Sequence, residues 1–435
     1  AKSTALEYAG EHIGGALWQY FEGQGDAERA LAAMKDASRY TRGHLSRDAV
    51  HALYGGAVTL SASRMDMARS CHFAYFMRYG LKARERTGAG FDAPQIGTFV
   101  HDVMEHTLRQ AKECGGLHTL SKDKLHALVR ASIEEYIDRV LPDLSEKSAR
   151  FRYLFNRLCA TVERIMDEVS EELQSSDFEP LAFELEFGAD GQLPAITIRE
   201  ENGTARVVGK VDRVDGWLHD GKLYLRVVDY KTGKKSFDLA ELRYGLGLQM
   251  LLYLFTLKEE GQMLFGGHEI VPAGVLYTPA REPMLRCARD TEPEKIEKAL
   301  KKELRRSGMV LEDPAVLQAM EHSAIESPCY LPIAVKRDGA VTGSLASAEQ
   351  LGKLSKYVDH ILHEITQEVF AGNIDADPYA RTPQQSACTY CEFASACHFE
   401  NGCGSDRMEY IKATKNDEFW QYIDEVNGEG AHENG

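Results

Sequence analysis

The sequence predicts an α/β fold in which helices flank a mixed β-sheet. Two short apolar runs are joined by a turn through Asp215, Gly216, Asp220 and Gly221, a pattern typical of an antiparallel strand pair. The expected strands are Leu181–Phe187, Ala205–Asp212, Leu223–Lys231 and His268–Tyr277. The expected long helices are Lys122–Val140, Ser145–Leu173 and Ser347–Ala371.

The two central strands each carry an acidic residue near one end. Side chains alternate faces along a strand, so Asp229 and Lys231 share a face with the apolar residues Leu225 and Val227. Asp212 ends the preceding predicted strand in a similar position. Two carboxylates and a lysine at neighbouring strand ends favour a site for a hard divalent cation, with the ammonium steadying nearby negative charge.

The composition limits the possible classes of protein. The chain has 435 residues, 43% of them hydrophobic, which is enough for two or three domains. No apolar run of about 18 residues predicts a transmembrane helix, and residues 1–10 do not resemble a signal peptide. The first residue is Ala rather than Met, so a piece of a longer chain is one interpretation. A net charge of −16 argues against broad coating of DNA, but it is compatible with a narrow basic channel or a basic partner protein.

Nine cysteines without a secretory signal predict a reducing, cytoplasmic location and metal or cluster ligation rather than disulfides. Three of them have the close spacing of a metal site: Cys388, Cys391 and Cys397. Three thiolates leave one tetrahedral position open, for which His398 and Cys403 are candidates. Cys71 lies among aromatic residues, where a buried core thiol is the simpler interpretation. Zinc suits this spacing as well as iron does.

Several motifs together resemble one nuclease family. Asp212 followed by Asp229-Tyr230-Lys231 resembles the core motif of the PD-(D/E)XK nucleases, and Gln249-x-x-x-Tyr253 resembles the helix motif of their RecB-type branch. Residues 61–81, SASRMDMARSCHFAYFMRYGL, resemble the cysteine-bearing segment of the AddB subunit of AddAB helicase-nucleases. The resemblance covers residues 60–399 and implies a restriction-endonuclease-like core with helical insertions.

The same resemblance implies a split set of cluster ligands. In that family one upstream and three downstream cysteines hold a 4Fe–4S cluster, which here implies Cys71, Cys388, Cys391 and Cys397. His72 departs from the proline that the family usually has after the first ligand. Joining position 71 to positions near 390 closes a long loop, so we expect a structural staple rather than an electron carrier.

The resemblance also implies the catalytic set. Gly97-x-x-x-His101 fits the helix that supplies a metal-binding histidine. The implied Mg²⁺ or Mn²⁺ ligands are His101, Asp212, Asp229 and the carbonyl of Tyr230. Lys231 would position water or stabilise charge, and Gln249 and Tyr253 would orient Lys231 or the scissile phosphate. Glu105 and Glu186 are further candidates. A solvated helix face is favoured for Glu105, and an exposed acid on an edge strand is equally plausible for Glu186.

By this resemblance the chain is a metal-dependent deoxyribonuclease, with exonuclease action expected. Its substrate would be single-stranded DNA from an unwound duplex end, produced by an AddA-like helicase-nuclease partner during processing of double-strand breaks. One alternative is a stand-alone iron–sulfur exonuclease like the CRISPR-associated members of the superfamily. Another alternative is an inactive DNA-binding scaffold. The complete set of expected metal ligands argues against it, because an inactive site has no physical reason to keep side chains that repel one another.

The remaining segments carry less chemistry. We expect a partial helical segment at residues 1–58, a nuclease domain at 59–400, and a C-terminal helix with a disordered tail at 401–435. Helices are expected near Asp26–Ser38 and Ser46–Leu53, and a further helix from Ser61 or Ser63 to about Tyr79. A lysine-rich helix is expected at 292–307, with a solvated surface favoured over a face that tracks phosphates.

Overall fold

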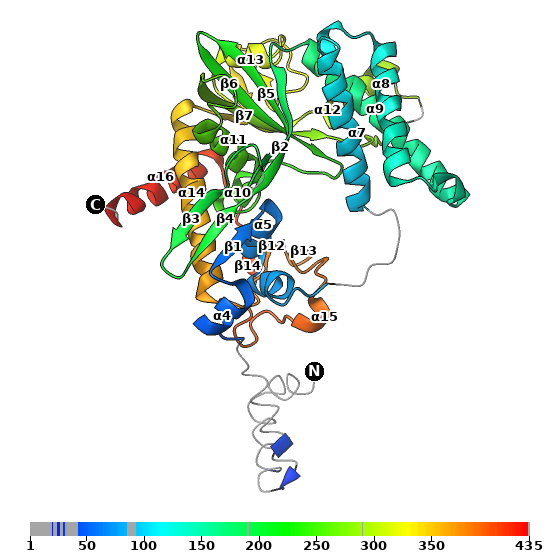
Figure 1. Cartoon of the computed structure of the whole chain (residues 1–435). Coiled ribbons are helices and arrows are strands. Elements are labelled where there is room, and N and C mark those ends of the chain that lie inside the picture. The colour runs from blue at the N-terminus through cyan, green and yellow to red at the C-terminus, as the bar shows by residue number, and fades with distance from the viewer. Residues whose placement is uncertain are drawn as a thin grey trace.

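A mixed six-stranded sheet with the order β11-β8-β7-β6-β5-β2 forms the centre of the computed structural model (Figure 1). The structure describes residues 20, 24–26, 29–30, 42–84, 93–188, 191–288 and 290–433. The strands are β2 (Glu179–Phe187), β5 (Gly209–His219), β6 (Lys222–Lys231), β7 (Glu269–Pro279), β8 (Ser307–Leu311) and β11 (Leu345–Ala346). The pairs β6–β7 and β8–β11 are parallel, and the others are antiparallel. The predicted α/β class with a mixed sheet is confirmed.

The β5–β6 hairpin differs from the prediction in its boundaries. Its turn contains only Asp220 and Gly221, both with positive φ, whereas Asp215 and Gly216 lie inside β5. The predicted strand Ala205–Asp212 is also wrong as a single element. Its first part belongs to β4 (Gly203–Val207) in another sheet, and β5 begins at Gly209. Asp212 therefore lies within a long strand rather than at a strand end.

The second sheet has three strands in the order β1-β4-β3. They are β1 (Ala57–Leu60), β4 and β3 (Ile196–Glu200), with β1 parallel and β3 antiparallel to β4. The chain passes from β4 to β5 through Val208 alone, so the apolar pattern continues although the sheet changes. Periodicity alone does not reveal such a change.

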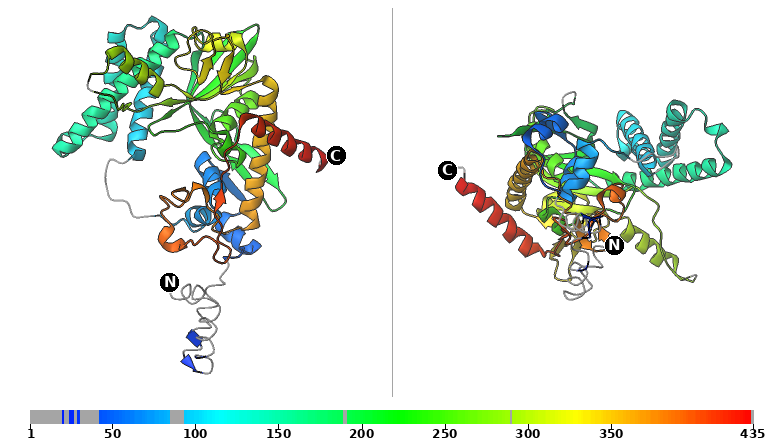
Figure 2. Two further views of the ribbon diagram at one scale, coloured as in Figure 1. Left: turned by 180° about the vertical axis from the view of Figure 1, so that it is seen from behind. Right: turned by 90° about the horizontal axis from the view of Figure 1, so that it is seen from below.

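Helices cover the sheet and extend one side of it. Figures 1 and 2 show α7 (Ala93–Glu113), α8 (Lys122–Val140) and α9 (Ala149–Gln174) on one side, away from α14 (Ala348–Ala371) and α16 (Asn416–Glu433). α7 contacts β2, and α11 (Gln249–Glu260) packs on β6, β7 and α14. The remaining elements around the sheet are α10 (Leu239–Arg243), α12 (Pro293–Glu303), α13 (Pro314–Met320), β9 (Ile333–Val335) and β10 (Val341–Gly343).

A buried network of charges joins the sheet to α9. Arg213 and Arg226, both fully buried on neighbouring strands, donate hydrogen bonds to the carboxylate of Asp215 at 3.0 and 2.8 Å. Glu172 of α9 pairs with Arg226 at 3.4 Å and accepts a hydrogen bond from Arg306 at 2.6 Å. Removing one member would leave an uncompensated buried charge, so this network fixes how α9 meets the sheet.

The segments around the cysteines form a separate lobe below the sheet in Figure 1. It contains α4 (Arg47–Tyr54), α5 (Ala62–Ser70), α6 (His72–Tyr75), a π-helical turn (Phe76–Gly80), β12 (Tyr379–Thr382), β13 (Gln385–Ser386), α15 (Ala394–Cys397) and β14 (Glu409–Tyr410). The predicted continuous helix to Tyr79 is wrong, because the backbone is extended at Cys71, with φ −173° and ψ 119°. The break turns the Cys71 side chain into the lobe instead of along a helix face.

Other helices agree with the sequence more closely. Residues 122–140 form a helix as predicted, α14 begins one residue after the predicted Ser347, and Ser347 with Gln350 forms a capping box. The expected helix Asp26–Ser38 lies largely outside the described residues. α16 spans Asn416–Glu433, and the expected disorder after about Val426 stays a prediction. None of the helices in the described residues has the length and apolar character required to cross a bilayer.

Candidate active site

His101 and Asp212 meet at the junction of α7 and the central hairpin. The Nδ1 atom of His101 lies 3.3 Å from Oδ2 of Asp212, and its Nε2 is 2.9 Å from the Tyr230 carbonyl oxygen. The Tyr230 amide donates a hydrogen bond to the same Asp212 oxygen at 2.8 Å. Burial disfavours the imidazolium, but Asp212 and the carbonyl together raise the pKa of His101 to about 9. The pocket thus favours a positive charge at this point.

Glu184 completes a group of three potential ligands. Ligand atoms of His101, Glu184 and Asp212 all lie within 4.8 Å of one another, the only group of three or more metal-ligating side chains so close among the described residues. Burial raises the pKa of Glu184, against the effect of Lys210, whose Nζ lies 2.5 Å from the Glu184 carboxylate. One imidazole and two carboxylates are suitable ligands for a divalent cation such as Mn²⁺ or Mg²⁺.

Glu184, and not Glu186, is the acid of β2 that belongs to this group. Both approach Lys210, but the Glu184 side chain is 13% exposed and that of Glu186 is 54% exposed. Glu184 has a positive φ of 50°, an unusual backbone conformation for this residue. Glu105, one turn after His101 on α7, forms an ion pair with Arg109 at 2.7 Å. The structure therefore places Glu186 at the rim of the site and Glu105 in an ion pair beside it.

Asp229 and Lys231 lie next to this group, on β6. The register that pairs Arg213 with Val228 brings Asp229 beside Asp212. Lys231 Nζ is 2.7 Å from Asp229 Oδ2, and Gln249 Nε2 donates weakly to Oδ1 at 3.4 Å. Burial and the nearby Asp212 raise the pKa of Asp229 to about 6, although Lys231 lowers it. Asp229 is thus held by Lys231 and Gln249 and is not within the 4.8 Å group.

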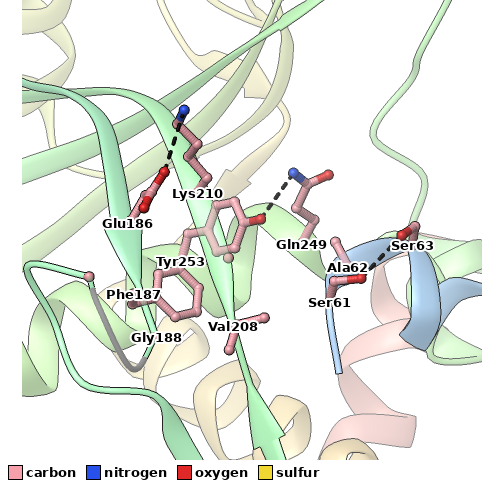
Figure 3. Close-up of a pocket in the computed structure, with 12 residues that line it drawn as sticks. Ser61, Ala62, Ser63, Glu186, Phe187, Gly188, Val208, Lys210, Gln249 and Tyr253 are labelled. Atoms are coloured by element: carbon pink, nitrogen blue, oxygen red, sulfur yellow. Dashed lines mark hydrogen bonds and ion pairs between the residues drawn. The ribbon is translucent and has the colours of Figure 1, made fainter. Parts of the chain in front are cut away.

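Gln249 and Tyr253 lie one helical turn apart at the start of α11, as their spacing predicts. Gln249 donates a hydrogen bond to the Tyr253 hydroxyl at 3.2 Å. Figure 3 shows both facing a cavity of about 620 Å³ that Lys210 and Glu186 line from the sheet. A Cβ atom on Gly209 would lie 2.5 Å from the Tyr253 ring, so glycine is required where β5 passes under α11.

All four cysteines implied by the sequence line one cavity. Cys71 comes from the break after α5, Cys388 and Cys391 from the turn after β13, and Cys397 from the end of α15. The cavity measures about 190 Å³, and its other lining residues include Phe73, Pro378 and Phe399. Burial raises the pKa of Cys71 to about 12, so its thiolate requires a nearby cation. Cys403 does not line this cavity, and His398 does.

The short helix α5 connects the cysteine lobe to the start of α11. Asp66 accepts a hydrogen bond from the Gly247 amide at 2.9 Å, two residues before Gln249. Arg69 donates to the Tyr244 carbonyl at 3.2 Å and pairs with Glu368 of α14. Because Cys71 follows α5 directly, the helix that contacts the start of α11 also leads into the first cysteine of the cavity.

The chain also matches known proteins. The family model of the PD-(D/E)XK nuclease superfamily matches residues 59–398. The chain is 30% identical over 422 residues to the B-type subunit of the ATP-dependent helicase/deoxyribonuclease of Ruminiclostridium cellulolyticum, covering 95% of this chain and 36% of that protein. It is 32% identical to the protein of the same name from Acetivibrio thermocellus, covering 94% of this chain and 35% of that protein.

These relatives are much longer than this chain, which spans about a third of their length. The family match includes the hairpin that carries Asp212, Asp229 and Lys231, the α11 residues Gln249 and Tyr253, and every cysteine of the cavity. A mixed sheet flanked by helices, with these side chains gathered at one place on it, agrees with that match. The chain is a member of the PD-(D/E)XK nuclease superfamily.

Proposed function

We propose that this chain is a Mg²⁺- or Mn²⁺-dependent deoxyribonuclease that hydrolyses phosphodiester bonds of single-stranded DNA. The observation that carries the proposal is the convergence of His101, Glu184 and Asp212 within 4.8 Å, beside Asp229 and Lys231. Three separate segments, α7, β2 and β5, bring these ligands together. Two neighbouring carboxylates such as Glu184 and Asp212 repel each other, and a cation bound between them would offset that repulsion.

The residues around this site suggest a division of roles. His101, Asp212 and Asp229, with the Tyr230 carbonyl, are the proposed ligands, and Glu184 is added to them because of its position. A bound divalent ion supplies an activated water and relief of charge on phosphorus. Lys231 is partly exposed beside Asp229, where its ammonium can orient the attacking water and stabilise developing negative charge. Gln249 and Tyr253 border the adjoining cavity, where they can orient the scissile phosphate.

A 4Fe–4S cluster is the proposed occupant of the cysteine cavity. Four thiols line one cavity of about 190 Å³, which suits an inorganic cluster. Around zinc, with bonds of about 2.3 Å, sulfur atoms lie roughly 4 Å apart. No three of these sulfurs lie within 4.8 Å of one another among the described residues, which favours the larger group. Such a cluster and the free thiols suit the reducing cytoplasm.

We further propose that the chain works as the nuclease part of an AddAB-like helicase-nuclease in processing DNA breaks, with exonuclease action on one unwound strand. The names of the relatives and the short span of the chain on them support this assignment. A helicase partner would deliver the strand and supply much of the grip on DNA. The stand-alone iron–sulfur exonuclease is the second candidate, and copurification with a motor protein separates the two. The complete ligand group argues against an inactive scaffold.

Metal removal tests the proposed function. A 5′-labelled single strand should be shortened by the chain in Mg²⁺ or Mn²⁺ and remain intact in EDTA, because no side chain here can activate water alone at a comparable rate. Restoring Mg²⁺ after EDTA should restore cutting. Cutting that continues at the same rate in EDTA would show that the metal mechanism is wrong, and an intact strand in every metal would refute the nuclease assignment.

Two acids of β2, Glu184 and Glu186, provide a matched pair of substitutions. Glu184→Gln should lower single-strand cleavage about a hundredfold, because it removes one charged oxygen ligand. Glu186→Gln should change it less than about threefold, since this side chain lies at the exposed rim. The measurement is the initial rate under saturating Mg²⁺. Equal losses in the two variants would contradict the assignment of Glu184 to the metal site.

A further inference from the structure

A second cavity adjoins the catalytic lysine and is strongly basic. It measures about 340 Å³, lies at the carboxyl ends of β6 and β7, and is lined by Lys231, Lys234, Lys235, Arg281, Arg305 and Glu303, among others. Five of these six side chains are cationic, although the whole chain carries a net charge of −16. We call this cavity the basic groove. Such a concentration of positive charge on an acidic protein favours an anionic ligand.

The countercharges around the basic groove are few and arranged to fix its walls. Glu303 pairs with Arg281 at 2.8 Å and with Lys234 at 3.3 Å. Arg305 donates a hydrogen bond to the Pro328 carbonyl at 2.6 Å, which holds it without neutralising it. The side chain of Lys234 is 79% exposed and can therefore reach a ligand. Asp229 and Glu241 pair with Lys231 and Lys235 from outside the lining, so three carboxylates face five cations and an excess of positive charge remains.

The position of the groove connects it to catalysis. Lys231 lines the basic groove and contacts one oxygen of Asp229, whereas Gln249 lines the cavity of Figure 3 and approaches the other oxygen. The Asp229 carboxylate thus lies between two cavities. A DNA strand that crosses the proposed metal site would enter both cavities. Its phosphates would meet mainly cationic side chains only in the basic groove.

We propose that the basic groove binds backbone phosphates of single-stranded DNA on one side of the scissile bond. This inference rests on the proposed function and adds to it the route of the strand. The binding is independent of sequence, because the aromatic residue that lines the groove, Tyr277, is buried and offers no face for stacking a base. The segment Thr232–Ser236, which includes Gly233-Lys234-Lys235, would contact these phosphates through its lysine side chains. It is not a nucleotide-binding loop, because the upstream glycine of that motif is missing.

The test is Lys234→Ala combined with Lys235→Ala in the whole chain. The double change leaves no carboxylate without a partner, since Glu303 keeps Arg281, and Glu241, which pairs with Lys235, keeps Arg381. Binding of a fluorescent oligothymidylate is measured against salt concentration, with Ca²⁺ replacing Mg²⁺ to suppress cutting. Loss of two phosphate contacts should make the slope of log K against log salt shallower by about 1.4. In Mg²⁺, KM should rise and kcat should change little.

The matched control also removes two lysine charges, but from a surface outside the basic groove. Lys298→Ala with Lys302→Ala lies on α12, away from the lining of the groove, and should leave the salt slope unchanged. Equal effects of the two double variants, or no effect of either, would overturn the inference even if the wild-type chain cuts DNA. A shallower slope only in the groove variant would support it. If the wild-type chain binds with this salt dependence but never cuts, the nuclease function fails while the groove assignment stands.

Discussion

Asp229→Asn is expected to lower the rate of single-strand cleavage at least about a thousandfold without unfolding the chain. The substitution keeps the volume of the side chain but removes a charge that Lys231 and the proposed cation both face. Folding should tolerate the change. Burial and Asp212 raise the pKa of Asp229 to about 6 in the folded protein, so its ionised form, which predominates at pH 7, lowers stability relative to the unfolded chain. The melting temperature in EDTA should therefore stay equal or rise slightly.

The control for this experiment is Asp220→Asn. Asp220 occupies the turn at the far end of the same hairpin, is 89% exposed, and has a positive φ that asparagine adopts readily. Its cleavage rate should remain within about twofold of wild type, as is usual for surface substitutions. Comparable rates for Asp229→Asn and Asp220→Asn would remove Asp229 from the catalytic set. A large fall in melting temperature of Asp229→Asn would instead identify a structural role.

Cys71→Ser is expected to abolish the iron content and strongly destabilise the chain. Wild-type protein prepared without oxygen should be brown and contain about four iron atoms per chain. A link between Cys71 and Cys397 closes a loop of roughly 300 residues, worth about 6 kcal/mol by loop-closure entropy. For a domain of this size that corresponds to a fall in melting temperature of about 8 °C.

Cys114→Ser serves as the matched thiol substitution. Cys114 is exposed and lies outside the cavity, so its iron content, colour and melting temperature should equal those of wild type. Zinc in place of iron, with colourless protein, would refute the cluster and leave the four-thiol site in place. Full iron content in Cys71→Ser would refute the split ligand set itself and return Cys71 to the role of a buried core thiol.

Much of the site could be predicted because its residues carry motifs with strict spacing. Asp229 and Lys231 alternate on one strand, and Gln249 and Tyr253 lie four apart on a helix, so simple periodicity places each pair on one face. The structure confirms these placements, and it brings His101 to Asp212 from a helix more than a hundred residues earlier in the sequence. The catalytic roles of these residues stay predictions.

The parts that escaped prediction depend on backbone conformation rather than residue type. Glu184 and Glu186 are chemically alike and fall on the same strand face. Only the positive φ at Glu184 and the packing against Lys210 bring one of them inward. The passage between sheets at Val208 leaves no gap in the apolar pattern. The break at Cys71 interrupts a sequence whose helical pattern continues without a glycine or proline. A resemblance in motif therefore located the site but not its boundaries.

The split cysteine set has a consequence for biosynthesis. Cys71 leaves the ribosome long before Cys397 does, so the four cysteines of the cavity come together only after residue 397 has emerged. Until then the Cys71 thiol lacks its three partner cysteines, as expected for contacts between residues so distant in the chain. If the proposed cluster fills the cavity, iron delivery is a late step of maturation, and a nascent chain that ends before residue 388 supplies only Cys71 of the four ligands.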